Sequence, residues 1–558
     1  MERYQEYYNY WLENVKDEEI RQQLLAMNET EKEDAFYRDR EFGTAGLRGV
    51  IAAGTNRMNI YTVAKASQGL ANYIVKKFPE KERRVAIAYD SRIKSDVFSK
   101  VTAGVLAAKG IKVFIYRELE PVPLCSYATR ELHCCAGVMV TASHNPSKYN
   151  GYKVYGPDGC QCTTEYANAV LAEIEATDTF KDVTQLPFEE GLEKGLISYI
   201  DDSMLTNFLE AVKTQSLVGD DEIDKDVAIV YSPLNGTGLI PVTRILKESG
   251  FTNITVVKEQ ELPDGNFPTC PYPNPEIKEA MALGMEYAAR YNADLLLATD
   301  PDADRVGMAV KTKNGDYQLI TGNQAGLLLL DYICSRRVAL GRMPEEPVLV
   351  KSIVTMDLAD RIAASYGVKT VNVLTGFKFI GEQIGLLEEK GEEDRYVFGF
   401  EESYGYLTGS YVRDKDAVNA AFMICEMFAY YKTRGISLLD KLDEIYAAYG
   451  CCLNTLHAYE FPGSAGMERM QSIMAAFHDG LTEIAGQKVI RTEDYSQGLN
   501  GLPKSDVLKF FIENGSVVVR PSGTEPKLKL YLSVTAVNRE AAEAKEREIT
   551  AELERKVL

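Results

Sequence analysis

The sequence predicts an α/β protein with three related domains followed by a smaller α+β domain at the carboxyl end. Short apolar runs alternate with amphipathic helical stretches in three successive rounds, which is typical of strand–helix–strand units and mainly parallel sheets. The last hundred or so residues instead contain closely spaced strand patterns and one long helical pattern. At about 150 residues per domain, the 558 residues correspond to three or four domains.

The first round follows a polar, acidic segment at residues 1–40, which we expect to form a leading helical extension. Its predicted strands are residues 83–92, 112–119 and 134–143, with a helix at 95–110 that ends in a glycine. The second round has strands at 226–236, 253–259 and 293–300 and helices at 241–250 and 275–292. The third has strands at 347–355, 368–376 and 395–403.

In the final part, residues 505–534 are predicted to form strands with turns at Asn514-Gly515 and at 521–526, and residues 538–558 a helix. The three rounds and the final part together define four domains. We expect mixed or parallel sheets in the first three and place the boundaries at 1–217, 218–321, 322–450 and 451–558.

Composition restricts the partners. The chain has 62 Lys and Arg against 82 Asp and Glu, a net charge of −20, which argues against nucleic acid and anionic membranes as partners. A small anionic substrate needs only a local cluster of cations. The sequence shows no signal peptide and no run of 18 apolar residues, and its ten cysteines form no C-x-x-C pair. We therefore expect a cytoplasmic protein with reduced thiols and no membrane partner.

The segment from Thr141 to Pro146 directly follows an apolar strand pattern. Ligands of open α/β sheets gather at the carboxyl ends of strands, so Ser143, followed by His144, is a candidate exposed nucleophile. Turn formation alone would also account for Ser, Asn and Pro here. The G-x-S-x-G elbow of α/β-hydrolases is absent.

Three carboxylates at alternate positions, Asp300, Asp302 and Asp304, follow another strand pattern. Such carboxylates can direct their oxygens at one hard cation. An EF-hand is excluded because Arg305 stands where that loop needs glycine and Lys311 where it needs glutamate. Burying three carboxylates without a counter-ion is costly, which favours a bound Mg²⁺ over a solvated acidic loop.

Three further segments carry polar groups suited to a sugar phosphate. Glu401 and Ser403, after the strand pattern at 395–403, can bind neighbouring sugar hydroxyls, and a charged run at 413–416 follows. Residues 520–527 combine hydroxyls, a glycine and two cations, which suits a phosphate cradle. Residues 42–49 form a glycine-rich segment presenting one arginine. Without a ligand, an ordinary strand exit would explain Glu401 and Ser403, a surface charge run residues 413–416, and a hairpin turn residues 520–527.

Taken together and in this order, the motifs resemble the α-D-phosphohexomutase family, which includes phosphoglucomutases and phosphomannomutases. The resemblance is carried by FGTAGLRG, TASHNPSKYNGYKVY, DPDADR, TGFK, GFEESYG and RPSGTEPK, which extend from position 42 to about 534. It is strongest to the subgroup with longer chains and a leading extension. The resemblance implies four domains around a central cleft, in agreement with the predicted rounds.

The resemblance also implies residue roles. Ser143 would be phosphorylated and, with Asp300, Asp302 and Asp304, would hold Mg²⁺. Arg48, His144, Lys153 and Lys415 would support phosphoryl or proton transfer. The remaining implied contacts are to substrate, including its distal phosphate, and involve Arg305, Gly376, Phe377, Lys378, Glu401, Ser403, Lys415, Arg520, Ser522, Gly523 and Thr524.

The implied activity is a phosphosugar mutase that interconverts glucose 1-phosphate and glucose 6-phosphate, with glucose 1,6-bisphosphate as intermediate and activator. The aromatic Phe377 after Gly376 is similar to glucose-preferring members. The same loop also resembles members that act on pentose phosphates or make glucose 1,6-bisphosphate, so these, and mannose phosphates, stay open as alternatives. The oligomeric state, monomer or dimer, also stays open.

Two other protein classes share some of these features with a mutase. A phosphatase or mutase with an aspartate nucleophile would use Asp300 and Asp302, but the threonine of the D-x-D-x-T pattern is missing. A regulator that only binds sugar phosphates would not need the intact serine, acid trio and phosphate loop.

Overall fold

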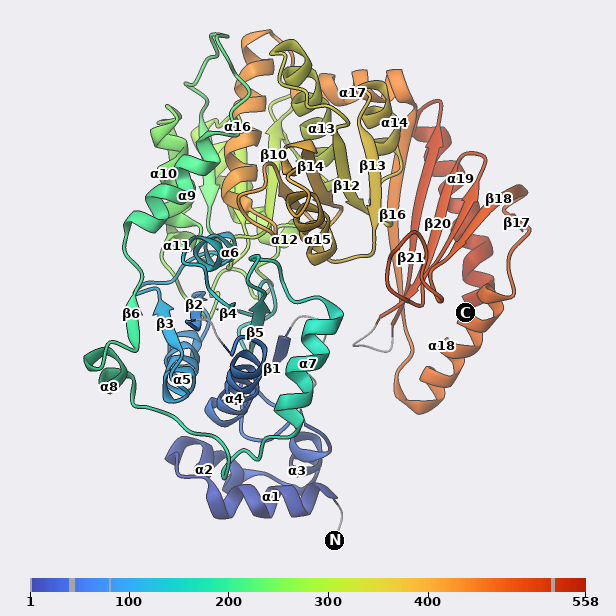
Figure 1. The fold of residues 1–558 in the computed structure, drawn as a ribbon. Coiled ribbons are helices and arrows are strands. Elements are labelled where there is room, and N and C mark those ends of the chain that lie inside the picture. Colours follow the sequence, from blue (N-terminus) through green and yellow to red (C-terminus); the bar gives the residue numbers. More distant parts are fainter. Residues whose placement is uncertain (1–2, 40–45, 80–81, 523–526, 558) are drawn as a thin grey trace. The chain divides into compact units, whose positions relative to one another are not determined.

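The computed structural model describes residues 3–39, 46–79, 82–522 and 527–557 (Figure 1). They form two compact units. The first contains Met1–Ile320, Phe377–Asp394 and Gly405–Ala429, and the second contains Thr321–Gly376, Arg395–Tyr404 and Tyr430–Leu558. No helix in the described part of the chain is long and apolar enough to cross a membrane.

The first unit begins with the predicted helical extension, which lies at one end of that unit (Figure 1, blue). Its helices are α1 (Arg3–Asn14), α2 (Glu18–Ala26) and α3 (Glu29–Phe36). Side chains of Asp17 and Asn28 cap α2 and α3. Trp11 is only 2% exposed and packs edge-on against Phe36, 5.7 Å between ring centroids. The extension therefore has an aromatic core of its own.

A six-stranded mixed sheet follows, with the strand order β1-β5-β4-β2-β3-β6. Its strands are β1 (Gly46–Val50), β2 (Arg84–Tyr89), β3 (Lys112–Ile115), β4 (Ala136–Val140), β5 (Tyr149–Tyr155) and β6 (Ile197–Tyr199). Its helices are α4 (Ile60–Lys77), α5 (Ser95–Ala108), α6 (Val122–Glu131), α7 (Thr164–Glu175), α8 (Phe188–Glu193) and α9 (Ser203–Lys213). Strands β4, β2, β3 and β6 are parallel; β5 is antiparallel to β4, and the edge strand β1 is antiparallel to β5.

The second sheet of this unit has the order β11-β10-β9-β7-β8. Its strands are β7 (Ile229–Ser232), β8 (Ile254–Val256), β9 (Leu295–Thr299), β10 (Val306–Lys311) and β11 (Tyr317–Ile320). Its helices are α10 (Leu239–Glu248), α11 (Lys258–Glu261) and α12 (Lys278–Tyr291). Further along the chain, α15 (Phe377–Glu388), β15 (Gly405–Leu407) and α16 (Ala417–Thr433) up to Ala429 also belong to this unit.

The second unit contains a parallel arrangement, β13-β12-β14, and a six-stranded antiparallel sheet, β16-β21-β20-β19-β18-β17. The first has β12 (Val348–Ser352), β13 (Lys369–Val373) and β14 (Tyr396–Glu401), with α13 (Gly322–Ala339), α14 (Leu358–Ser365) and α17 (Leu438–Tyr449). A short 3-10 helix covers Glu393–Arg395. The second has β16 (Cys451–Glu460), β17 (Glu483–Ile484), β18 (Gln487–Asp494), β19 (Leu508–Ile512), β20 (Gly515–Pro521) and β21 (Lys527–Ala536), with α18 (Gly463–His478) and α19 (Arg539–Val557).

The predicted α/β rounds and the final α+β part are therefore confirmed, and the first two sheets are mixed, one of the two arrangements expected. The cause is the length of two connections: β4 leads into β5, and β9 into β10, through short loops. Such loops can join only antiparallel neighbours, because a parallel return needs a long crossover. The predicted turn at 521–526 lies largely outside the described residues, and the domain boundaries stay predictions.

We predict that Phe36→Ala destabilises the helical extension, because Phe36 is 1% exposed and contacts Trp11. The expected loss in unfolding free energy is about 3–5 kcal/mol. Trp11 is the chain's single tryptophan, so its fluorescence in a urea titration reports on unfolding of the helical extension. The neighbouring Tyr37→Ala is the control, since Tyr37 is 44% exposed. Equal shifts in both variants would contradict the packing described.

Candidate active site

The predicted serine and acidic loops meet in the first unit, at the carboxyl ends of their strands. Ser143 follows β4 and Asp300 follows β9. Ser143 Oγ donates a hydrogen bond of 2.8 Å to Asp300 Oδ2 across a sequence separation of 157 residues. The fold thus joins two motifs that the sequence could only place separately.

The backbone at Ser143 is strained. Its φ is +50°, in the left-handed region that residues other than glycine rarely adopt. The Ser143 N–H donates to Thr141 Oγ1 at 2.7 Å, and the Thr141 hydroxyl donates to Asp90 Oδ2 at 2.6 Å. This short relay holds the serine in a conformation that points its hydroxyl at the acid trio.

A buried arginine, Arg92, fixes the rest of the serine loop. Its guanidinium donates to the carbonyl oxygen of Ser143 (3.2 Å from Nε) and to those of Pro146 and Tyr149 (both 3.0 Å from Nη1). Nη2 also donates to the carbonyls of Ser143 and Asn145. One planar donor group therefore satisfies four carbonyl oxygens and sets the path of the loop.

Asp90 balances the charge of Arg92. The carboxylate lies 3.4 Å from Arg92 Nε and accepts hydrogen bonds from the Arg92 N–H (3.0 Å) and from Ser95 Oγ (2.8 Å). Burial raises the pKa of Asp90 and Arg92 opposes that rise. Because β2 and β4 are parallel neighbours, this pair sits at the same sheet edge as Ser143.

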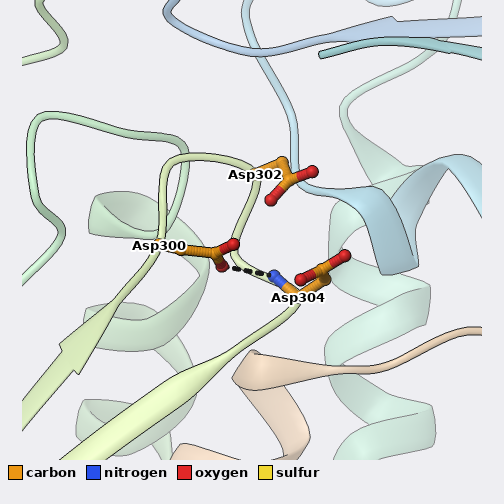
Figure 2. Close-up of side chains that lie close together, drawn as sticks. All are labelled: Asp300, Asp302 and Asp304. Atoms are coloured by element: carbon orange, nitrogen blue, oxygen red, sulfur yellow. Dashed lines mark hydrogen bonds between the residues drawn. The ribbon is translucent and has the colours of Figure 1, made fainter. Parts of the chain in front are cut away.

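Asp300, Asp302 and Asp304 form the group of carboxylates shown in Figure 2. All three are buried, and one ligand oxygen of each lies within 4.8 Å of the others. Asp300 Oδ1 accepts the backbone N–H of Asp304 at 3.1 Å and that of Arg305 at 2.9 Å. The loop thus turns its own carboxylates toward one point, as a metal site needs.

The electrostatics of this trio fit a divalent cation. Burial and the neighbouring carboxylates of Asp302 and Asp304 raise the pKa of Asp300 well above its ordinary value. Burial acts in the same direction on Asp302, but Lys153 outweighs it and lowers that pKa. Among the described residues, Asp302 Oδ1 and Asp304 Oδ1 have no hydrogen-bond partner. Hard oxygen donors, crowded and partly unsatisfied, are the donor set that Mg²⁺ takes.

Two lysines face the trio. Lys153 Nζ lies 3.0 Å from Asp302 Oδ2 and 3.4 Å from Asp304 Oδ2. Lys415 Nζ lies 3.1 Å from Asp304 Oδ2 and 3.3 Å from Asp414 Oδ1. Burial alone would lower the pKa of Lys153, but the carboxylates of Asp302 and Asp304 raise it. Two fixed ammonium groups therefore stand beside the serine and the trio.

The other predicted basic residues, His144, Arg48 and Arg305, lie around the serine loop. His144 Nδ1 lies 3.2 Å from Ser143 Oγ, and Arg48 Nη1 donates to Asn145 Oδ1 at 2.8 Å. Burial, reinforced by Arg305 and Arg48, lowers the pKa of His144 well below its ordinary value. The imidazole is therefore neutral near pH 7. Arg305 itself is paired with Glu276 at 2.5 Å.

The predicted sugar-loop and phosphate-loop residues divide between the units. Phe377 and Lys378 belong to the first unit, where Lys415 Nζ lies 5.7 Å from the centroid of the Phe377 ring. Burial lowers the pKa of Lys378. The others, Gly376, Glu401, Ser403, Arg520 and Ser522, belong to the second unit.

Within the second unit, the Gly376 N–H donates to Glu401 Oε1 at 2.7 Å, so these two predicted residues are brought together. Arg520 lies on β20 and hydrogen-bonds Tyr531, whose pKa burial raises to about 12. Gly523 and Thr524 lie outside the described residues.

The sequence reasoning missed four residues of this site: Asp90, Arg92, Tyr155 and Asp414. The Tyr155 hydroxyl donates to Asp414 Oδ2 at 2.9 Å, and the other oxygen of this carboxylate accepts from Lys415 Nζ. Asp90 and Arg92 stand at the end of the predicted strand at 83–92, where side chains at a sheet edge are candidates for a site, but this position does not indicate which loop they hold. Asp414 adjoins a predicted residue, but no local pattern distinguishes its carboxylate from surface charge.

Comparison with known proteins places most of the chain in one family. Residues 39–181, 206–315 and 321–449 match alpha/beta/alpha domains I, II and III of "Phosphoglucomutase/phosphomannomutase", and residues 463–551 match its C-terminal domain. A phosphoglucomutase of Staphylococcus saprophyticus is 36% identical over 543 residues, covering 95% of this chain and 96% of that protein.

Solved structures share the fold. A putative phosphomannomutase from Thermus thermophilus has a TM-score of 0.69 at 22% identity, covering 93% of this chain and 99% of its own. The open form of parafusin, a phosphoglucomutase from Paramecium, has a TM-score of 0.69 at 18% identity, covering 93% and 95%. The predicted four-part α/β architecture is thereby confirmed.

We predict that Arg92→Met loosens the serine loop, because it removes the guanidinium donor from four carbonyl oxygens and the positive charge beside buried Asp90. The expected loss in unfolding free energy is about 3–5 kcal/mol, with faster hydrogen exchange of residues 141–150. Arg84→Met is the matched control: Arg84 begins β2, the strand that leads to Arg92, but its ion pair with Glu82 lies at the surface. A loop equally protected in both variants would contradict the role given to Arg92.

Proposed function

The chain belongs to the phosphoglucomutase/phosphomannomutase family, and we propose that it interconverts glucose 1-phosphate and glucose 6-phosphate through a phosphoserine at Ser143. The chain is a phosphohexose mutase, since its relatives named phosphoglucomutase match it over nearly its full length. The observation that carries the serine mechanism is the 2.8 Å contact between Ser143 Oγ and Asp300, inside a buried acid trio faced by two lysines.

Phosphoryl transfer depends on positioning and charge neutralisation more than on a strong base. Asp300, Asp302 and Asp304, with an oxygen of phosphorylated Ser143, would hold Mg²⁺, which when bound supplies positive charge to the transferring group. Lys153, beside Asp302 and Asp304, would add positive charge to neutralise the phosphoryl oxygens. The rigid serine loop would keep the nucleophile in line.

Proton movement falls to two groups. Neutral His144, 3.2 Å from Ser143 Oγ, would take the serine proton when a phosphoryl group returns to Ser143. As a neutral amine, Lys415 would take the proton of the sugar hydroxyl that accepts the phosphoryl group, and as an ammonium it would give that proton to the sugar oxygen that releases it. Its ammonium is held between Asp304 and Asp414, which fixes it beside the trio. Glucose 1,6-bisphosphate is the intermediate and, by phosphorylating Ser143, the activator.

Substrate recognition would use the remaining residues. Glu401 and Ser403 would bind sugar hydroxyls, and the Gly376 N–H already orients the Glu401 carboxylate. Phe377 with Lys378 would select the sugar, and Arg305 would contact the phosphoryl group. Arg520, Ser522, Gly523 and Thr524 would hold the distal phosphate. A pentose or mannose phosphate, or synthesis of glucose 1,6-bisphosphate, is the alternative on the same residues.

The substrate is tested by comparing kcat/KM for the 1-phosphates of glucose, mannose, ribose and N-acetylglucosamine, with glucose 1,6-bisphosphate present. We expect glucose 1-phosphate to be converted at least about tenfold more efficiently than the others, since a pocket distinguishes close analogues by 10–200-fold. A preference for ribose 1-phosphate would replace glucose by a pentose. Absence of any interconversion would refute the mutase itself.

The nucleophile is tested by Ser143→Ala, which we expect to lower kcat by at least about a thousandfold, as loss of a covalent nucleophile does. Ser147→Ala, in the same loop, is the matched control and should keep wild-type activity. Incubation with labelled glucose 1,6-bisphosphate should leave acid-stable label on Ser143. Label recovered instead as an acyl phosphate on an aspartate would sink the serine mechanism.

A further inference from the structure

A second charge cluster lies in the first unit, built from Arg130, Glu388 and Arg413. Arg130 Nη2 lies 2.6 Å from Glu388 Oε1, and Arg413 Nη2 lies 2.8 Å from Glu388 Oε2. One carboxylate at the end of α15 thus bridges a guanidinium from α6 and one from the segment before α16. None of the three residues belongs to the site described above.

Arg413 depends on this carboxylate. Its side chain is 0% exposed, and among the described residues Glu388 is its acidic partner within ion-pair distance. Nη1 donates to the carbonyl oxygens of Ser410 and Val412, so the guanidinium also closes its own turn. Burial and the charge of Arg130 both lower the pKa of Arg413, whereas Glu388 raises it. A fully buried cation beside a second cation needs this counter-charge.

Arg413 is tied to the segment that carries Lys415. The Arg413 N–H donates to Ser126 Oγ at 3.0 Å, and its backbone pairs with Cys160 in an isolated parallel bridge. Two residues further on, Lys415 Nζ contacts Asp304 at 3.1 Å. A shift of Arg413 would therefore be passed along two residues to the ammonium group facing the acid trio.

Helix α15 is tied to the same segment. It begins at Phe377 and ends at Glu388. Near its start, a Cβ added at Gly381 would lie 2.3 Å from the Arg413 carbonyl oxygen, so only glycine allows this close approach of the two backbones. Cys160 Sγ donates to the Lys378 carbonyl at 3.2 Å. The helix thus contacts the Arg413 segment at its first turns and again at its last residue.

We propose that Glu388 is a positioning residue of the mutase. By neutralising Arg413 it locks α15 against residues 410–415, and this keeps Phe377 and Lys415 in place beside Asp304. The inference rests on the proposed function, in which Lys415 moves the proton of the sugar hydroxyl. It also gives a physical reason why α15 packs into the first unit although the sequence predicts it in the third domain.

The test is Glu388→Gln, which keeps the shape of the side chain but leaves two guanidinium groups without their carboxylate. We expect kcat for glucose 1-phosphate to fall by about 10–100-fold, since misplacing a reacting group by about 1 Å costs about that much. KM should change less than threefold, because the residues assigned to the distal phosphate are untouched. Exchange of backbone amides in 410–416 should become faster.

Two further variants separate positioning from general damage. Arg130→Gln added to Glu388→Gln removes the excess cation. The double variant should have a kcat at least about threefold higher than that of Glu388→Gln. Glu389→Gln, an exposed neighbour on the same helix end, should behave as wild type in kcat and in amide exchange. Melting temperatures of all variants are compared with that of the wild type.

Wild-type kcat and amide exchange in Glu388→Gln would overturn the inference, as would a kcat loss that only follows a fall in melting temperature. A loss that the added Arg130→Gln does not relieve would also overturn it. An inactive wild type would instead refute the proposed function, and the inference with it. An active wild type with an unaffected Glu388→Gln refutes the inference alone.

Discussion

The buried negative charge of Asp300, Asp302 and Asp304 is the constraint around which the first unit is organised. Three carboxylates cannot share one dry space unless cations and donors surround them. Lys153 and Lys415 supply the cations, and the Ser143 hydroxyl and two backbone N–H groups supply the donors. The catalytic groups proposed here are thus the same groups that make the trio tolerable in the folded chain.

Strand topology delivers these groups to one place. The short connection after β4 forces β5 to return antiparallel, which brings Lys153 beside Met139 of β4. The next antiparallel strand, β1, pairs Arg48 with Gly151. A parallel β5 would need a long crossover in place of the short loop after β4, so Lys153 would not return directly beside the strand that leads to Ser143. The departure from a parallel sheet therefore has a functional consequence.

Local patterns were enough to predict Ser143 and the acid trio, because each motif stands directly after an apolar strand. They could not predict Arg92, whose role depends on β2 lying next to β4, a pairing between segments about fifty residues apart. The order of the elements along the chain also does not indicate that α15 packs with the first unit. That packing includes the contact between buried Arg413 and Glu388 at the end of α15, and local sequence patterns do not reveal this contact. What the sequence lacks is this pairing information, not the chemistry of the residues.

The balance of charges around Ser143 is a stronger argument for a divalent cation on the acid trio than the sequence motif alone. Around Ser143 the structure gathers Arg48, Arg92, Lys153, Arg305 and Lys415, but also Asp90, the trio, Glu276 and Asp414. These acids match or outnumber the cations before any phosphate arrives. A phosphoserine and a bisphosphate would add several negative charges in a region of low dielectric, where repulsion is strong. The protein's own side chains do not offset that charge, and a divalent ion on the trio would do so where the phosphoryl group is transferred.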